Sequence, residues 1–229
     1  MDGRVILADG TTVSLRRTAR ARRMTLRVSR RDGSVTLTLP PRLPRAEALA
    51  FLDDRRDWLS RALAGIEPQQ VIEFGIGLPV EGRPLTLTPA QVRAPRVEDA
   101  LLLLPKGRPA AVSAGAFLRT LAQARLAAAS DRHAAVLGRR FAAITLRDTR
   151  SRWGSCTHGG RLMYSWRLAM APPEVLDYVA AHEVAHLAHM DHSAAFWATV
   201  TRLYPGFAQP RAWLRQNGAS LHAWRFRAE

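Results

Sequence analysis

The sequence predicts an α+β protein in which a β-rich N-terminal half is followed by a largely helical half. Apolar and polar residues alternate, as on strands with one buried face, at residues 4–7, 12–16, 24–28 and 34–39. Asp-Gly pairs typical of turns separate these segments. The second half contains a long Ala- and Leu-rich stretch and a later segment with apolar residues at helical spacing. A hydrophobic content of 47% is enough to form a substantial core.

Further elements follow along the first half. Residues 44–65 are expected to form one helix with a core face, and residues 71–88 to form hairpins; the core face comprises Ala48, Phe51, Leu52, Leu59 and Leu63. Residues 105–109 have the sequence PKGRP, which is typical of a linker. We therefore expect a β-rich part with one helix over residues 1–109 and a catalytic part over residues 110–229, or one compact unit containing both.

The second half alternates helices and strands. Residues 114–137 predict a long helix, and residues 144–147 and 162–168 predict strands on either side of a glycine-containing loop. After residue 172 comes the segment with helical spacing. A helix over residues 194–204, capped by Ser193, and a short helix over residues 210–216 complete the chain.

The formal charge is +15, and residues 1–45 contain eleven arginines against three aspartates. Lys106 is the only lysine, so the arginine excess can reflect a bias in composition that leaves a solvated arginine face. The alternative is that the Arg-rich N-terminal strands bind nucleic acid. No zinc knuckle, helix-turn-helix signature or aromatic RNA-binding box accompanies the charge.

The chain contains one cysteine, Cys156, which excludes an intrachain disulfide and suits a reducing compartment. We expect it to be a small buried residue. The sequence contains no apolar run long enough to span a membrane and no secretory signal, so a cytoplasmic location is expected. His133, His158 and His222 lack a partner at ligand spacing and are expected at the surface.

The segment His182-Glu183-Val184-Ala185-His186 is the strongest functional signal. Two histidines four residues apart lie on one face of a helix, where both imidazoles can bind one metal ion. Glu183 can then act as general base toward a water on that ion, as in HExxH zinc hydrolases. Pro172 and Pro173 precede the helix, and the motif is expected in the middle of an amphipathic helix.

A catalytic zinc usually takes three protein ligands, and His189 and His192 compete for the third place. His189 would lie a further turn along a straight helix, whereas His192 can reach the metal after a bend. A left-handed conformation at His189 could provide that bend. Metzincins share the spacing of His192, but no methionine follows it to form their methionine turn. We therefore expect His192 to be the ligand and His189 to be a helix-end cation or an outer contact.

Residues 151–156 (SRWGSC) and 164–168 (YSWRL), together with the HExxH segment and Phe196-Trp197, resemble the YgjP-like metallopeptidases, which are related to the SprT-like zincins. The resemblance extends over almost the full chain. It implies a zincin-like catalytic half in which His182, His186 and His192 bind one Zn²⁺ ion and Glu183 is catalytic. Ser165 stands where this family is expected to have asparagine.

The resemblance also implies an edge strand beside the HExxH helix, which we expect over residues 162–168. An extended substrate can add to such an edge through backbone hydrogen bonds. Arg152, Trp153 and Arg167 are the candidate substrate contacts. The alternative is structural, with Arg152, Trp153 and Trp166 in a packing and cation–π cluster beneath the site.

Three functions are compatible with these residues. The leading hypothesis is a zinc peptidase that acts on a peptide or protein. The second is a metal-dependent pyrophosphohydrolase of nucleoside triphosphates such as UTP, although the chain has no Gly-rich phosphate loop and no carboxylate cluster for magnesium. The third is a nucleic-acid-associated protease of the SprT-like kind, recruited through the Arg-rich strands.

Overall fold

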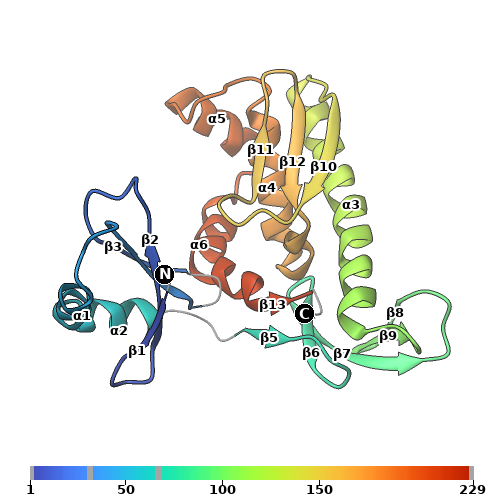
Figure 1. Cartoon of the computed structure of the whole chain (residues 1–229). Helices are drawn as coiled ribbons and strands as arrows, with labels where there is room; N and C mark the ends of the chain where they lie inside the picture. Colours follow the sequence, from blue (N-terminus) through green and yellow to red (C-terminus); the bar gives the residue numbers. More distant parts are fainter. Residues whose placement is uncertain (1–2, 30–32, 65–68, 227–229) are drawn as a thin grey trace. The chain divides into compact units, whose positions relative to one another are not determined.

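The computed structural model describes residues 3–29, 33–64 and 69–226, and the fold is α+β (Figure 1). The chain divides into two compact units, Met1–Gln69 and Gln70–Glu229, each with its own hydrophobic core. This division differs from the expected boundary after residue 109. Among the described residues, no helix combines the length and the apolar character needed to cross a bilayer.

The first unit contains a four-stranded sheet and two helices. The strand order is β1-β2-β4-β3, with β2 and β4 parallel and the other pairs antiparallel. The elements are β1 (Gly3–Ile6), β2 (Thr12–Arg17), β3 (Thr25–Val28), β4 (Val35–Leu39), α1 (Arg45–Asp54) and α2 (Arg56–Ala64). The four strands expected from alternation are thus confirmed. Val13 and Leu15 pair with Val35 and Leu37, so the buried faces of the two central strands coincide.

The helix expected over residues 44–65 is interrupted. The chain leaves helical geometry at Arg55, where φ is −97° and ψ is 10°, so two short helices replace one. This break lets Leu52 of α1 and Leu59 of α2 both enter the core of the unit, where each is almost fully buried. The predicted end at Gly65 lies outside the described residues.

The second unit begins with a small sheet of order β6-β7-β9-β8 and then continues into the helical part. The elements are β5 (Gln70–Val71), β6 (Gly77–Val80), β7 (Arg83–Ala90), β8 (Arg96–Glu98), β9 (Leu101–Pro105), α3 (Ala110–Leu137), β10 (Ala143–Arg147), β11 (Gly154–Cys156), β12 (Arg161–Ser165), the 3-10 helix η1 (Trp166–Met170), α4 (Pro173–Ala185), α5 (Ala194–Leu203), α6 (Ala208–Ala223) and β13 (Trp224–Arg225). Figure 1 shows α3 running along the unit, from β8 and β9 at one end to β10 at the other.

The expected linker at residues 105–109 does not separate two domains. Leu102 and Leu104 of β9 share a single core with Leu118 of α3 and Val179 of α4. The chain returns at its end to the same region, where β13 pairs with β5. Apolar packing therefore joins residues 70–109 to the helical part, which explains why the boundary between units falls at residue 69.

Helix α4 is buried on nearly all sides rather than amphipathic. It begins after Pro172, with Pro173 at its first position, and its apolar residues contact α3, α5, α6 and β11. The tip of the β6–β7 hairpin is attached near this start, since the Glu81 and Gly82 N–H groups donate to Ala169 O and Met170 O. Packing therefore fixes both the position and the rotation of the helix that carries the HExxH segment.

Candidate metal centre

Three histidines converge at the C-terminal end of α4. His182 lies in the last turn of the helix, His186 is its C-cap residue, and His192 follows a tight turn. One nitrogen from each ring lies within 4.8 Å of the others. The motif was expected in the middle of a helix, but α4 ends at Ala185. This early end lets the chain turn back and bring His192 beside His182.

His192, rather than His189, completes the group. His189 instead contributes its backbone carbonyl oxygen, to which His186 Nδ1 donates at 2.9 Å. A carbonyl can only accept, so the proton resides on Nδ1 and the Nε2 lone pair of His186 is free for a metal ion. His189 does not adopt a positive φ; the bend is made by consecutive turns over residues 186–188.

The spacing of the imidazole nitrogens fits a shared ion. His182 Nε2 and His192 Nε2 are 3.2 Å apart. Two nitrogens that bind one zinc ion at tetrahedral angles and about 2.0–2.1 Å would lie roughly 3.3 Å apart. Burial lowers the pKa of His182 to about 3 and also lowers the pKa of His186. Both rings are therefore neutral near pH 7, which is the form that binds metal.

Aromatic side chains from α5 support the three imidazoles. Phe196 is fully buried, and its ring centroid lies 4.5 Å from that of His186, 4.8 Å from that of His192 and 5.0 Å from that of His182. Trp197 stacks on His192 at 6.0 Å. Ser193 caps α5 as expected, because its Oγ accepts from the Phe196 N–H. The cap thus fixes the first turn of the helix that carries both supporting rings.

Glu183 is 5% exposed and faces the same cavity as the histidines. Burial raises the pKa of Glu183 to about 8, against the opposing charge of Arg152. The carboxylate lies against the backbone of β11. A Cβ atom at Gly154 would lie 2.5 Å from Glu183 Oε1 and 2.6 Å from its Cγ, so a side chain there would force Glu183 to shift. Gly154 therefore allows the helix to carry Glu183 this close to the strand.

The cavity has a volume of about 420 Å³. Its walls are the segment 152–156, the last turns of α4, the loop that ends at His192, and Leu214 of α6. Tyr178, Met190 and Cys156 also line it. Cys156 was expected to be simply a buried residue, yet it is only partly buried and borders the site. Burial, and then the charge of Glu183, raises the pKa of its thiol to about 11.

The edge strand beside α4 is β11, not the strand expected over residues 162–168. The sheet order is β10-β12-β11, so β12 is central, and it ends at Ser165. The Ser165 N–H donates to Trp153 O and the Thr157 N–H donates to Arg161 O, both across the β11–β12 pair. Backbone groups alternate sides along a strand, so those of Gly154 and Cys156 point to the open edge.

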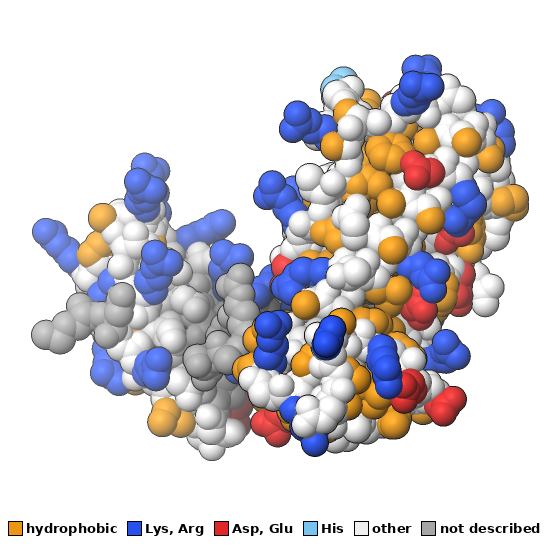
Figure 2. Space-filling view, turned by 90° about the vertical axis from the view of Figure 1, so that its right-hand side faces the viewer, with side chains coloured by type: hydrophobic (Ala, Val, Ile, Leu, Met, Phe, Trp, Pro, Cys, Tyr) orange, Lys and Arg blue, Asp and Glu red, His pale blue; other side chains and the backbone are white. Residues whose placement is uncertain are grey.

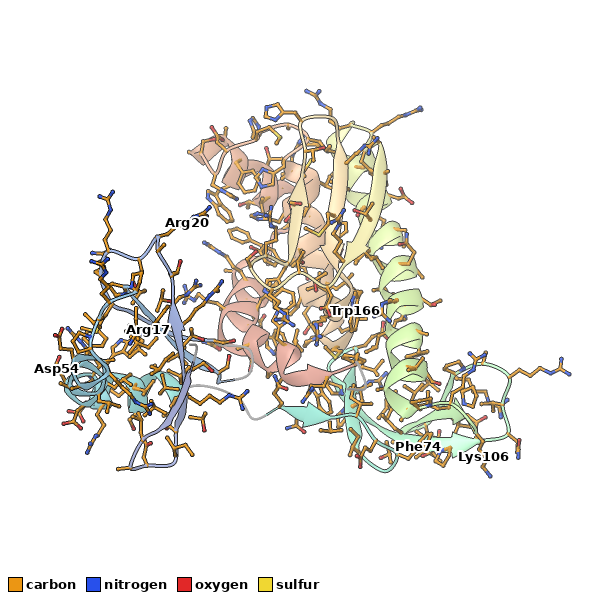
Figure 3. All side chains as sticks on the ribbon, viewed as in Figure 1. Arg17, Arg20, Asp54, Phe74, Lys106 and Trp166 are labelled. Atoms are coloured by element: carbon orange, nitrogen blue, oxygen red, sulfur yellow. The ribbon has the colours of Figure 1, made fainter. Side chains whose placement is uncertain are left out.

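Of the three candidate substrate contacts, two line the cavity and one does not. Arg152 and Trp153 line the cavity. Arg167 does not; it is 6% exposed and donates to both carboxylate oxygens of Asp148, and to Leu221 O and Trp224 O. It follows Trp166, which Figure 3 labels in the interior of the second unit. Arg167 is thus a structural residue that ties the loop after β10 to the end of α6.

The structural alternative also differs from the expected cluster. The cations over the Trp166 ring are Arg119, at 4.6 Å, and Arg167, at 5.0 Å. Trp153 stacks instead on His222, at 4.8 Å. His222 is therefore not a plain surface residue. His133 is buried and its Nε2 lies 2.7 Å from Asp177 Oδ1, so the expectation of a surface position is wrong for it.

Sequence reasoning did not single out Gly154 or Phe196 as parts of the site. Gly154 lies in the segment 151–156 that carries the family resemblance, and a glycine in or next to a strand often marks a close backbone approach. Phe196 follows the Ser193 cap by three residues, a spacing that places it in the first turn of α5 facing the core. Met190 and Tyr178 carry no sequence signal that would separate a cavity wall from ordinary core.

A comparison with known protein families assigns the chain to one of them. The family model described as "YgjP-like, metallopeptidase domain" matches residues 22–217. The chain belongs to this family. The match includes most of the first unit, the segment 151–156 and all three clustered histidines, so the YgjP-like domain spans both units. The family is one of metallopeptidases, and a divalent metal and a peptide substrate follow from that description.

Among solved structures, a metallopeptidase zymogen, abylysin of Pyrococcus abyssi, is similar to part of the chain. It is 19% identical, and the alignment covers 39% of this chain and 93% of that one with a TM-score of 0.36. A comparison with curated proteins gave no match.

Replacing Arg167 tests its structural role. We expect Arg167→Ala to lower the free energy of unfolding by about 2–4 kcal/mol, because it leaves Asp148 and two carbonyl groups unpaired. This range already allows for solvent screening of Asp148, whose side chain is 40% exposed. Arg161→Ala, which removes an exposed arginine from β12, should change the free energy of unfolding by less than about 0.5 kcal/mol. Urea unfolding measures both. Equal losses in the two variants would show that Arg167 is not structural.

The same ion pair predicts a pH dependence. Burial raises the pKa of Asp148, but the hydrogen bond and charge of Arg167 outweigh it and hold that pKa below its ordinary value. Because the pKa of Asp148 is lower in the folded chain, this residue stabilises the fold at pH values above its unfolded-state pKa of about 3.9. The stabilisation is lost as the pH falls through the pKa of Asp148 in the folded chain. Acid unfolding below about pH 4 should therefore be less steep in Arg167→Ala than in the parent protein.

A double-mutant cycle tests the contact between Gly154 and Glu183. We expect Gly154→Ala to destabilise the protein by about 1–3 kcal/mol through overpacking, and the loss to shrink in a Glu183→Ala background, where the clashing atoms are absent. Gly77→Ala at the start of β6 is the control, because its Cβ would meet only Pro84 Cβ at 3.6 Å. A cost for Gly154→Ala that is the same in both backgrounds would contradict the contact.

Proposed function

We propose that the protein is a zinc-dependent peptidase in which His182, His186 and His192 hold one Zn²⁺ ion and Glu183 is the general base. The observation that supports this most is the meeting of three imidazole nitrogens and the Glu183 carboxylate in one cavity beside the open edge of β11. All-nitrogen ligation by three histidines, with a further position open to the cavity, suits a catalytic zinc.

Zinc bound there would supply a water with a pKa near ~7 and polarise the scissile carbonyl. The charge of the bound ion would lower the raised pKa of Glu183, so that its carboxylate would accept the proton of the attacking water and deliver it to the leaving amine. Its position against Gly154 keeps the carboxylate pointed into the cavity, and the neutral His182 and His186 keep their lone pairs for the ion. Phe196 and Trp197 hold the imidazoles and exclude water from their inner side.

The substrate would extend along β11. The N–H and C=O groups of Gly154 and Cys156 point to the open edge and can pair with a peptide backbone, as in strand addition. Arg152 and Trp153 lie at the start of this edge and flank the cavity. Backbone pairing with β11 fixes the direction of the substrate peptide, while the side chains of the peptide contact neighbouring surfaces. The scissile bond can therefore be presented without a specific residue at every position of the substrate.

The two other hypotheses have less support from the described residues. The cavity that holds the histidines contains one arginine, Arg152, and across the described residues the three histidines are the one group of metal-binding side chains; no carboxylate cluster for magnesium accompanies them. In the first unit, Arg16, Arg20 and Arg22 are exposed, but basic side chains on the face shown in Figure 2 are spread over both units. UTP hydrolysis and nucleic-acid recruitment therefore remain alternatives for the experiment to separate.

Substitution of the base and of the ligands tests the proposal. Glu183→Gln should keep zinc and fold but lower hydrolysis of casein by a factor on the order of 10²–10⁴, the share that general acid–base catalysis contributes. His192→Ala should lose zinc by metal analysis, whereas the matched variant His189→Ala should retain it, because His189 contributes a backbone carbonyl and not its ring.

Other results would contradict the assignment. Zinc loss in Glu183→Gln would make Glu183 a ligand, and full zinc content in His192→Ala would remove the third ligand proposed here. The same preparations should be assayed with UTP under several divalent metals. Pyrophosphate release without proteolysis, abolished by Glu183→Gln, would replace the peptidase assignment by phosphohydrolysis.

A further inference from the structure

A second cavity adjoins the histidine cluster on the other side of His186. Its volume is about 530 Å³, and it shares His186 and Met190 with the first cavity. Its remaining walls come from the segment after α3, the turn between β11 and β12, and residues 187–188. The two cavities are therefore neighbours that meet at these two side chains.

The walls of this second cavity are held by backbone contacts. Helix α3 ends at Gly138, which is left-handed with φ of 70°, and the Arg139 N–H then donates to Ala134 O. The chain continues beside the β11–β12 turn, where the Ala142 N–H donates to Gly160 O at 2.8 Å. The Gly160 N–H in turn donates to Thr157 O, which closes the turn. The segment carrying Arg139 and Arg140 thus has a defined position relative to β11.

The charge of this cavity is entirely of one sign. Arg139, Arg140 and His158 line it, and no aspartate or glutamate does. Both arginines are exposed, and the guanidinium group of neither makes an ion pair or a hydrogen bond to another described residue. They follow the C-terminus of α3, where cations offset the helix dipole by about 0.3–1 kcal/mol. That role needs only proximity to the helix end and does not account for a cavity that reaches the metal-site histidine.

In a third cavity, between α3 and α4, the arginines are paired with acidic residues. It has a volume of about 570 Å³ and also contains two arginines. There Arg125 is paired with Glu81 and Arg132 with Asp177, so the positive charges are already neutralised. In the cavity beside His186 the guanidinium groups keep their hydrogen-bond donors available, and paired N–H donors are well matched to a carboxylate.

We propose that the cavity lined by Arg139, Arg140 and His158 is a subsite for a carboxylate of the peptide substrate. The inference rests on the proposed peptidase function and narrows it to substrates that carry a negative charge close to the scissile bond. The carboxylate comes from an Asp or Glu side chain or from the C-terminus of the substrate. A peptide paired with β11 brings one of its residues past Met190 into the subsite, where Arg139 and Arg140 bind the charge.

Binding to an inactive protein tests the subsite without depending on turnover. The zinc-loaded Glu183→Gln protein is titrated, at about 0.15 M salt to screen remote charges, into three fluorescent peptides of one Ser/Ala sequence. The first is end-blocked with a central Glu, the second has Gln in its place, and the third has Gln and a free C-terminal carboxylate. We expect a carboxylate-bearing peptide to bind about tenfold more tightly than the end-blocked Gln peptide, and the two acidic arms identify which source of charge is used.

Removal of the two arginines provides the decisive comparison. Arg139→Ala/Arg140→Ala, made in the same protein, should reduce the carboxylate preference to less than about twofold while leaving affinity for the Gln peptide unchanged. The control Arg93→Ala/Arg108→Ala removes the same charge from exposed positions. Arg108 lies at the opposite end of the 28-residue α3, about 40 Å from Arg139. The control should keep the preference.

The outcomes separate the subsite from the peptidase assignment. Equal affinity for all three peptides, or a preference that survives loss of Arg139 and Arg140, overturns the subsite even if the parent protein hydrolyses the Gln peptide. A preference that depends on both arginines, in a protein whose parent form hydrolyses no peptide, supports a carboxylate site and overturns the peptidase. A preference lost equally in the control variant shows only a general effect of charge and also overturns the subsite.

Discussion

The site depends on one constraint, which is that α4 is packed on nearly all sides while its last turn opens into a cavity. Nine of the thirteen residues of the helix are buried, and its neighbours include α3, β11, α5 and α6. This packing fixes the rotation of the helix, and with it the directions of His182 and Glu183. The closest approach is at Gly154, where even a methyl group would displace the Glu183 carboxylate. The glycine on β11 and the burial of α4 on nearly all sides therefore meet the same requirement, which is to fix the position of Glu183.

Much of the fold and the centre of the site could be predicted from the sequence. Period-two alternation identified the four strands of the first unit, because a sheet with one buried face imposes that pattern directly. The spacing of His182 and His186 placed two imidazoles on one helical face, and the family resemblance agreed with His192 as the third. The chain does bring these three residues together, since a bend after His186 returns it toward the helix.

The rest depends on long-range contacts that the sequence does not display. The PKGRP segment has linker composition, yet the strands before it share the core of α3 and α4, so composition placed the boundary some forty residues too late. Arg167 was expected to contact the substrate, because a guanidinium can bind a carbonyl, carboxylate or phosphate. It is buried because Asp148 and two carbonyl groups from the end of α6 surround its guanidinium. The edge strand was misplaced because edge position depends on strand order, which local periodicity does not encode.

The central claim is that three imidazoles hold a zinc ion while Glu183 stays outside the coordination sphere. Diffraction at the zinc absorption edge, from crystals of the full chain grown with zinc, tests it most directly. The account predicts one anomalous peak about 2.0–2.1 Å from a nitrogen of each of His182, His186 and His192, with the Glu183 carboxylate facing the open position. Coordination by the His189 ring in place of His192, or a direct bond from Glu183 to the ion, would contradict it.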